Sequence, residues 1–515
     1  MKNILLMLFV SVLWGCIEDN GNYDYIATRE LKAMDVKRYY TLSEGESVTL
    51  TPKVVEKEDK EEKVIENVEF EWYIDHELVS NEASFTYTAK KNGFYAGTMK
   101  MKDPVSQAYS FTDFFITVSS KYESGFMILS EENGKSVLSM IRAKWLNSPD
   151  TVVYEGEWKD IYALENGGEI LNGKPVSLSE HWAYEMSNSC IGEVTLMTEE
   201  NGKMCVRELN GESLKRETYI EDEFANKELP TNFKPQKVIH TCFDSFILDG
   251  SGEIYSRRST APGGYHTGYF SSKTKFWNGQ KFEDIFFTQY DNTSAILAIE
   301  VDDEGKRNYV GIYSDNYRAE YNLRRLTIGG DSDDLKDIQD EILWADWRAN
   351  GNYYGCGMSV MMKNKAGDYI LHYFDMEEAS RTSWKVEFSD KINLTQTHGI
   401  SKVIAMCTNK KMNYTYFCDD YNIYAIDNYY GDFYKVKSFD KKIINMADNS
   451  IIGEYDGYPV GLAVAFEDGS IEIWEVERND ATAFKGKVYE SENNYGGNIK
   501  SIIFKIGENG RFFDM

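Results

Sequence analysis

The chain of 515 residues carries a formal net charge of −28 at pH 7, and 14% of its residues are aromatic, including 36 tyrosines. A polyanion is repelled by nucleic acid and gains nothing from anionic lipid headgroups, so this charge excludes both as ligands. The length is sufficient for two or three domains, and a tyrosine-rich chain with only 8 prolines favours β-sheet.

The N-terminus has the features of an export signal. Lys2 precedes an apolar run over residues 4–13, which matches the core of a signal peptide and is too short for the ~20 residues of a membrane-spanning helix. The segment that ends at Cys16 resembles the lipobox of bacterial lipoproteins, although Trp14 stands where a small residue is usual. We therefore predict a signal peptide over residues 1–15 and acylation of Cys16, with an ordinary signal peptide as the alternative.

Two acidic residues follow the predicted anchor. Glu18 and Asp19 resemble the signal that directs lipoproteins of Bacteroidota to the outer face of the outer membrane, and a solvated linker is the alternative. We accordingly predict a lipid-anchored linker over residues 16–38 and a location at the cell outer membrane, facing the extracellular side. Two or more acyl chains would hold the protein there, because one chain alone anchors only weakly.

Residues 39–120 have the pattern of a small sandwich. Five short segments alternate apolar and polar residues, as strands do. They are residues 46–54, 67–79, 83–89, 93–103 and 110–118. Trp72 lies among them without a cysteine pair, which predicts an immunoglobulin-like or PKD-like sandwich that has no disulfide. The charged run at residues 56–63 is predicted to be a solvated hairpin.

Residues 121–515 contain a repeat of roughly 50 residues. Each unit is an apolar strand, an acidic turn and a second strand, and glycine can supply the positive φ that such a turn requires. The turns fall at Gly134, Gly202, Gly252, Gly305, Gly367, Asp419 and Gly469. Units of this length form four-stranded blades, so the repeat predicts a β-propeller of about seven blades, with eight as the alternative. The last apolar run, residues 499–507, is predicted to close the ring by joining the first blade.

Six cysteines remain after the predicted anchor. They are Cys190, Cys205, Cys242, Cys356, Cys407 and Cys418. An even number permits disulfides in an exported protein. The spacing of these cysteines is not that of a small disulfide-rich domain, however, and a chain of this size can fold without disulfide bonds. We predict mostly buried thiols, with a bridge between Cys407 and Cys418 as the alternative.

Signals of catalysis are weak. The sequence has no G-x-S-x-G elbow, no H-E-x-x-H zinc motif and no P-loop, and its six histidines are scattered, so no catalytic or metal site is predicted. Acidic segments at residues 249–253, 301–306 and 329–334 offer oxygen ligands for a structural calcium ion, but surface turns explain them better. Carboxylates from different blades could still meet at the mouth of a propeller, which leaves glycoside hydrolysis open.

Two aromatic segments are the candidate ligand-binding or interface sites, because loops of several blades converge at a mouth of the ring. Their residues are Tyr265, His266, Tyr269 and Phe270 within residues 259–270, and Trp344, Trp347, Arg348, Tyr353 and Tyr354 within residues 343–357. Tyrosine combines rigid area with a hydroxyl group, which suits sugar faces and peptide backbones. The alternative is that these side chains pack onto their own blades.

Three segments together resemble the PKD-like family of lipoproteins in Bacteroidota. They are GNYDY at residues 21–25, FFITV at residues 114–118 and SGFMILSEENGKSVLS at residues 124–139. The resemblance implies a PKD/immunoglobulin-like sandwich followed by a propeller. It also implies association with SusC/SusD-type outer-membrane nutrient importers, including the RagA/RagB type. No catalytic residues are attached to the family pattern, so it implies none here.

The sequence therefore predicts a non-enzymatic accessory of a SusC/SusD-type importer that has no cofactor and binds or presents oligopeptides or oligosaccharides. Peptides are slightly favoured, because no dense cluster of tryptophans forms a sugar platform. One alternative is a surface glycoside hydrolase or peptidase with carboxylates at the propeller mouth. The other is a purely structural subunit of the transporter complex.

Overall fold

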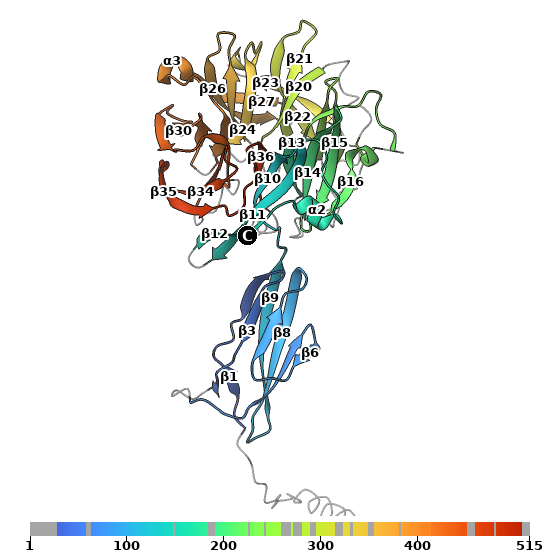
Figure 1. Cartoon of the computed structure of the whole chain (residues 1–515), viewed down its shortest axis with the longest axis vertical. Coiled ribbons are helices and arrows are strands. Elements are labelled where there is room, and N and C mark those ends of the chain that lie inside the picture. Colours follow the sequence, from blue (N-terminus) through green and yellow to red (C-terminus); the bar gives the residue numbers. More distant parts are fainter. Residues whose placement is uncertain are drawn as a thin grey trace, which may run out of the picture. The chain divides into compact units, whose positions relative to one another are not determined.

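The computed structural model describes residues 28–506, except for short internal segments. These segments are residues 58–62, 148–149, 184–190, 225–226, 242–243, 259–268, 271–280, 289–294, 315–322, 330–332, 349–354, 381–382, 411, 451–458 and 478–479. The chain divides into two compact units, Met1–Ser119 and Ser120–Met515, and both are built from β-strands (Figure 1). Within the described residues, no helix is long and apolar enough to cross a membrane.

The first unit is a β-sandwich. A five-stranded sheet has the order β2-β9-β8-β5-β6, and the strand pairs β3-β7 and β1-β4 share its hydrophobic core. The strands are β1 (Leu31–Ala33), β2 (Tyr39–Ser43), β3 (Ser47–Leu50), β4 (Val54–Glu56), β5 (Glu69–Ile74), β6 (Glu77–Ser80), β7 (Phe85–Thr88), β8 (Gly93–Lys102) and β9 (Tyr109–Ser119). β2 runs parallel to β9, and the other pairings in this sheet are antiparallel.

Trp72 lies at the centre of the sandwich core. Its ring is fully buried, with ring centroids 5.4 Å from Phe85 and 6.0 Å from Phe114. The indole N–H donates to the carbonyl of Glu82 at 2.8 Å, so burial leaves no unsatisfied donor on this side chain. The alternation along β5 places Trp72 on the inner face, and the predicted sandwich around this residue is confirmed.

The sandwich begins before the predicted boundary. Leu31 and Ala33, which the sequence analysis placed in the linker over residues 16–38, are buried in the sandwich core on β1. Arg29 forms an ion pair with Asp103 at 2.8 Å, which ties the start of β1 to the end of β8. The predicted linker is therefore too long, because a three-residue strand with apolar residues at alternate positions completes this core.

The second unit is a β-propeller. Within the described residues its strands form seven blades, two of which join into one eight-stranded sheet. Each blade is given from its inner strand outward: the first is β36 (Ile499–Lys505), β10 (Gly125–Glu132), β11 (Lys135–Asn147) and β12 (Asp150–Trp158), the second is β13 (Lys174–Ala183), β14 (Ile191–Glu200), β15 (Lys203–Asn210) and β16 (Arg216–Tyr219), and the third is β17 (Pro235–His240), β18 (Asp244–Asp249) and β19 (Ile254–Arg258). The fourth is β20 (Lys281–Phe287), β21 (Ala295–Val301), β22 (Arg307–Ser314) and β23 (Leu323–Gly329), and the fifth is β24 (Glu341–Arg348), β25 (Gly355–Lys363), β26 (Tyr369–Ser380) and β27 (Ser383–Asn393). The sixth is β28 (Ala405–Asn409), β29 (Tyr414–Cys418), β30 (Asn422–Asp427) and β31 (Phe433–Ser438), and the seventh is β32 (Ile443–Asp448), β33 (Gly461–Phe466), β34 (Ile471–Glu477) and β35 (Asp480–Glu490). Short helices α2 (Ile161–Glu165), η1 (Ile220–Glu223), η3 (Asp333–Leu335) and α3 (Leu394–His398) lie between strands. The predicted propeller of about seven blades is confirmed.

The last strand closes the ring. β36 pairs antiparallel with β10 and thereby becomes the inner strand of the first blade. It lies beside β13 on one side and β32 on the other, and the inner strands follow one another around the ring in the order β36, β13, β17, β20, β24, β28 and β32. The predicted closure by the C-terminal apolar run is confirmed, and it joins the two ends of the propeller chain in one sheet.

The predicted hairpin turns define one face of the ring. Glycine occupies six of the seven turns, with φ between 75° and 93°. In the seventh, the Asp419 carboxylate accepts the backbone N–H groups of Tyr421 and Asn422 instead. Because neighbouring strands in each blade run in opposite directions, these turns share one face, the hairpin face. The loops that leave the C-terminal ends of the inner strands lie on the opposite face, here called the far face.

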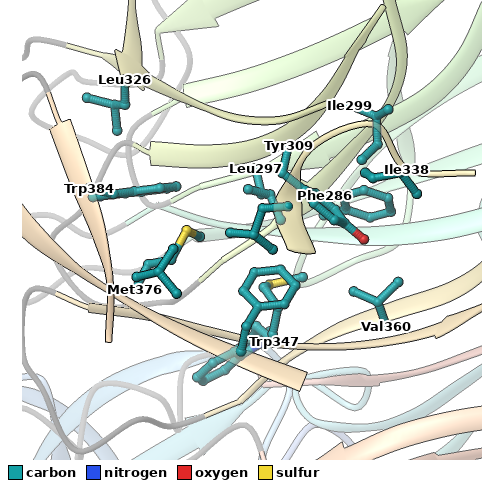
Figure 2. Close-up of a cluster of buried hydrophobic side chains, with 14 of the residues drawn as sticks. Phe286, Leu297, Ile299, Tyr309, Leu326, Ile338, Trp347, Val360, Met376 and Trp384 are labelled. Carbon is teal, nitrogen blue, oxygen red and sulfur yellow. The ribbon is translucent and has the colours of Figure 1, made fainter. Parts of the chain in front are cut away.

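The fourth and fifth blades share an outer edge. β23 runs parallel to β27, so that Ile328 pairs with Trp384. Trp384 belongs to a buried cluster that fills the space between these blades (Figure 2). Gly311 makes room for it, since a Cβ atom there would lie 2.8 Å from the Trp384 ring and 2.9 Å from Leu326. The pairing covers strand edges that would otherwise be exposed.

The described thiols are unpaired. Cys407 and Cys418 are buried and free, and Cys205 is free and partly buried. The register pairs Cys407 with Tyr416, and burial raises the pKa of the Cys418 thiol to about 12, which makes it unreactive. The preferred prediction of buried thiols is therefore confirmed for Cys407 and Cys418. Cys190 and Cys242 lie outside the described residues, as does the side chain of Cys356.

Candidate functional site

The structure separates the predicted site residues into exposed, buried and undescribed groups. Tyr269 is 62% exposed, whereas its neighbour Phe270 is buried. The Phe270 ring packs against Phe224, with a centroid distance of 5.6 Å, and the Arg257 guanidinium lies 4.7 Å from its centroid. Phe270 is therefore a core residue and not a ligand contact. Cys16, Glu18, Asp19, Tyr265, His266, Tyr353 and Tyr354 lie outside the described residues.

The aromatic residues of β24 are structural. Trp344 is partly buried against the cluster between the fifth and sixth blades, and Trp347 is buried in the cluster of Figure 2 between the fourth and fifth. The predicted binding role is corrected for Trp347. Side chains of an inner strand point alternately toward its two neighbouring blades, so aromatic residues there fill the gaps between blades.

Arg348, at the end of β24, is also a buried structural group. Its guanidinium forms an ion pair with Asp375 at 2.7 Å and donates to the side-chain oxygen of Asn413 at 3.0 Å. Gly357 provides the space, because a Cβ atom there would lie 2.7 Å from Arg348 Cγ. The predicted ligand contact is therefore corrected: Arg348 links the fifth blade to the sixth.

The residue between the two tryptophans belongs to a different group. Asp346 accepts hydrogen bonds from the backbone N–H and the hydroxyl of Thr408, at 2.9 and 2.8 Å, and forms an ion pair with Lys410 at 2.7 Å. Lys410 also lies 3.9 Å from Asp448, which accepts a 2.7 Å hydrogen bond from Ser450. We call Asp346, Thr408, Lys410, Asp448 and Ser450 the inner-strand ion network. It joins the far-face ends of β24, β28 and β32.

Burial controls the charges of this network. Desolvation alone would lower the pKa of Lys410, but Asp346 and Asp448 raise it above its ordinary value, so the ammonium persists at neutral pH. Desolvation raises the pKa of Asp448 to about 6, although Lys410 opposes the rise. Asp346 is about a quarter exposed and Asp448 is buried. Only one of the two carboxylates thus meets solvent, whereas glycoside hydrolysis requires two that flank one bond.

The raised pKa of Asp448 predicts a pH-dependent stability. A carboxyl group whose pKa rises from 3.8 to about 6 on folding stabilises the fold fully below pH 3.8, and this contribution is lost as the pH rises through 6. The loss is worth about 3 kcal/mol. Asp448→Asn has no carboxyl group to titrate and does not lose this stability. The free energy of unfolding of the variant minus that of wild type should therefore increase by about that amount between pH 4 and pH 7.5.

Denaturant unfolding at several pH values measures this difference. Ser450→Ala is the control: it removes a hydrogen bond that lowers the pKa of Asp448, so the midpoint of the pH dependence should move upward. A difference between Asp448→Asn and wild type that stays constant from pH 4 to 7.5 would show that Asp448 titrates normally.

A rigid tyrosine turn projects on the same face. Tyr429 and Tyr430 are 55% and 82% exposed in the loop between β30 and β31. The Asp427 carboxylate accepts both of their backbone N–H groups, at 2.7 and 3.0 Å, and Gly431 closes the turn with φ 72° and a 2.8 Å hydrogen bond to the Asp427 carbonyl. This turn was not predicted, although the run DNYYGD at residues 427–432 has the Asp and Gly signals of a tight turn.

Two histidines distant in sequence meet between the second and third blades. The rings of His181 and His240 are stacked with centroids 4.8 Å apart. Thr195 and Ser245 hydroxyls bond the two ring nitrogens of His240, each at 2.9 Å, while Glu193 lies 3.5 Å from His181. Among the described residues, no group of three His, Cys, Asp or Glu side chains could hold a metal ion.

The acidic segments considered for calcium cap their own turns. Asp249 accepts hydrogen bonds from the backbone and hydroxyl of Ser251, at 2.7 and 2.5 Å. Asp302 accepts the backbone N–H groups of Glu304 and Lys306, at 2.9 and 2.8 Å, which helps to lower its pKa. Both carboxylates thus have the turn-capping role that the sequence analysis preferred. Residues 330–332 of the third segment lie outside the described part of the chain.

These features define an all-β protein in which a sandwich and a seven-bladed propeller share one chain. Residues 16–175 match the model of the PKD-like family. The match covers the sandwich, the strands β10, β11 and β12 of the first blade and the beginning of β13, so the PKD-like resemblance is confirmed for this part of the chain. No curated protein matches the sequence.

Several solved structures resemble the fold at low sequence identity. A quinoprotein alcohol dehydrogenase-like protein from Bacteroides thetaiotaomicron is 12% identical, with a TM-score of 0.36, over 93% of this chain and 100% of that one. A periplasmic gluconolactonase from Pseudomonas aeruginosa is 9% identical, with a TM-score of 0.43, over 74% of this chain and 98% of that one. The β-propeller domain of Cps50 (Swd1) from Myceliophthora thermophila is 12% identical, with a TM-score of 0.35, over 69% of this chain and 100% of that one.

Proposed function

We propose that the protein is a surface lipoprotein, anchored through Cys16, that serves as a non-enzymatic accessory of a SusC/SusD-type, RagA/RagB-like importer. In this role it binds or presents oligopeptides or oligosaccharides. The observation that carries the proposal is that the PKD-like family match begins at Cys16, the residue at which the lipobox-like segment would be cleaved. The acidic Glu18 and Asp19 support an outer, extracellular location.

The far face supports a binding role. Preorganised, exposed tyrosines make strong contacts, because a rigid ring loses little conformational entropy on binding. The backbone that carries Tyr429 and Tyr430 is fixed in a tight turn by Asp427 and Gly431, which sets the direction in which the two rings project. The inner-strand ion network on the same face has a buried ammonium and one partly exposed carboxylate, Asp346, which can accept a hydrogen bond from a polar ligand without providing an acid–base pair.

Lipid attachment is tested by changing the cysteine. Wild-type protein expressed in a host of the Bacteroidota should partition into detergent, carry acyl chains in intact-mass spectra and be digested by protease added to whole cells. Cys16→Ser should abolish acylation and membrane partition, while Cys205→Ser, which changes a partly buried thiol, should leave both unchanged. Membrane partition that survives in Cys16→Ser would contradict the anchor.

Ligand capture is tested on the far face. The double variant Tyr429→Ala with Tyr430→Ala should weaken binding of the imported oligomer about tenfold, because two rigid contact rings are lost, with little change in melting temperature. Tyr421→Ala is the matched control, since Tyr421 is 48% exposed in the same blade but on the hairpin face. Equal affinity of the double variant and Tyr421→Ala would remove this turn from the site.

Two outcomes favour the alternatives. Turnover of oligosaccharides or peptides that a single Asp or Glu substitution abolishes would identify a hydrolase. Co-purification with a SusC/SusD-type pair, without measurable affinity for any oligomer, would identify a purely structural subunit.

A further inference from the structure

The outer face of the five-stranded sandwich sheet carries exposed aromatic rings. Alternate residues of a strand share a face, so Tyr109, Phe111 and Phe115 on β9 point away from the core in which Phe114 and Ile116 are buried. Tyr109 and Phe111 are 50% and 61% exposed. A sheet face that meets only solvent normally carries polar side chains at these positions.

Three of the rings form a stack across neighbouring strands. Tyr39 on β2 lies opposite Phe115, with ring centroids 5.5 Å apart and ring planes 22° apart. Phe94 on β8 stacks on the other side of Phe115, at 5.3 Å and 22°. Tyr39 and Phe94 are 62% and 63% exposed. We call Tyr39, Phe94 and Phe115 the aromatic ladder; a contiguous exposed patch of this kind marks a binding surface.

The two lysines on this face lie beside Phe111 and Tyr109, because Lys100 pairs with Phe111 and Lys102 with Tyr109 in the sheet, and each lysine is neutralised by a glutamate. Lys100 forms an ion pair with Glu71, and Lys102 forms one with Glu69, both at 3.0 Å. The Thr98 hydroxyl donates to Asp113 at 2.9 Å. These groups form a polar row from Phe115 to Tyr109 in which both lysines are paired with glutamates and Asp113 accepts a neutral hydroxyl, in a chain whose total charge is −28. The face therefore favours an uncharged ligand with an apolar side and many hydroxyl groups.

We propose that this face binds an uncharged oligosaccharide or polysaccharide. The C–H face of each sugar ring would pack on the aromatic rings, and its hydroxyls would bond the polar row and the Arg38 guanidinium, which lies 5.5 Å from the Tyr39 ring centroid. The outward positions from Tyr109 to Phe115 extend about 20 Å along β9, enough for several sugar rings. The inference rests on the proposed nutrient-binding role and narrows the ligand to the glycan.

The experiment measures binding of the full mature chain to uncharged polysaccharides, with β-glucan, α-glucan and mannan as probes in affinity electrophoresis. Wild type should bind at least one probe. Binding should not weaken when the salt concentration is raised, because an uncharged polysaccharide forms no ion pairs with the protein that salt would screen. Tyr39→Ala with Phe94→Ala should weaken it at least about tenfold through the lost stacking, while Tyr39→Phe with Phe94→Tyr should retain it. Val105→Ala, at a residue 61% exposed in the β8–β9 connection, is the control.

The outcomes separate this inference from the proposed function. Retained affinity in the ladder variant overturns the inference, and so does a failure of wild type to bind any of the three probes. If the ladder variant instead changes the oligomeric state, the face is an interface with a second copy of the chain. If it abolishes only binding of an importer complex or of a peptide, the face binds a protein partner. Either result also overturns the inference. If the chain binds a glycan through the ladder but forms no complex with an importer, the inference is upheld and the proposed importer role is contradicted.

Discussion

A chain that ends at Asn498 is expected to lose the folded propeller. The truncation removes β36, the inner strand of the first blade, and uncovers the strands β10, β13 and β32 that it contacts. A propeller ring that cannot close leaves open strand edges and the apolar faces of two blades in water. The sandwich is a separate compact unit and should keep its own unfolding transition.

Phe504→Ala tests the same closure with a single side chain. Phe504 is buried, with its ring centroid 5.0 Å from that of Phe126 in an edge-to-face contact. Removing a buried phenylalanine costs about 3–5 kcal/mol of the free energy of unfolding, through lost burial and the cavity left behind. Lys500→Ala is the matched control on the same strand, because Lys500 is exposed. Denaturant unfolding of the propeller measures both, and an effect of Phe504→Ala as small as that of Lys500→Ala would contradict the closure.

Arg257→Ala is expected to destabilise the propeller by about 3–5 kcal/mol, because it deprives a buried carboxylate of its cation. The Arg257 side chain is fully buried and forms a two-pronged ion pair with Glu208, at 2.7 and 3.1 Å. It reaches Glu223 at 3.1 Å as well, which connects the third blade to the second. These carboxylates raise the pKa of Arg257 despite its burial, so the guanidinium stays charged.

Two controls separate the charge from the packing. Arg257→Met combined with Glu208→Leu removes both charges of the two-pronged pair and retains apolar volume, so it should be less destabilising than Arg257→Ala. Lys385→Ala breaks an exposed ion pair with Glu387, which water and salt screen, and should leave stability nearly unchanged. Thermal unfolding followed by circular dichroism ranks the three. A double variant that is as unstable as Arg257→Ala would indicate that shape, not charge, governs this contact.

The hairpins of the propeller were predictable because their signals are local. A glycine between two apolar strands, as at Gly134 or Gly469, meets the positive φ of a tight turn within a few residues. The closing strand was also predictable, because an apolar run such as residues 499–507 after the last hairpin has no partner along the chain. The short β1 strand escaped prediction, since three residues are too few to establish a period.

The candidate site could not be predicted in the same way. Trp344, Trp347 and Arg348 were expected to meet a ligand, but an inner strand is flanked by a blade on each side, and the structure uses Trp347 and Arg348 to join blades. Asp346 lies between the same residues and becomes part of the inner-strand ion network. Its partner Lys410 is far along the chain, and no sequence spacing indicates that the two meet.

Sequence by itself determined the β-class, the sandwich followed by a propeller, the positions of the hairpins and the segment that resembles a lipid anchor, because alternation and turn residues act over a few neighbours. Only the tertiary structure decided which polar and aromatic residues are buried between blades and which remain in contact with solvent. The aromatic ladder illustrates the reason: Tyr39, Phe94 and Phe115 lie on three different strands, and their stacking depends on strand order and register. Long-range pairing sets that order, so these rings become one surface only in the folded sheet.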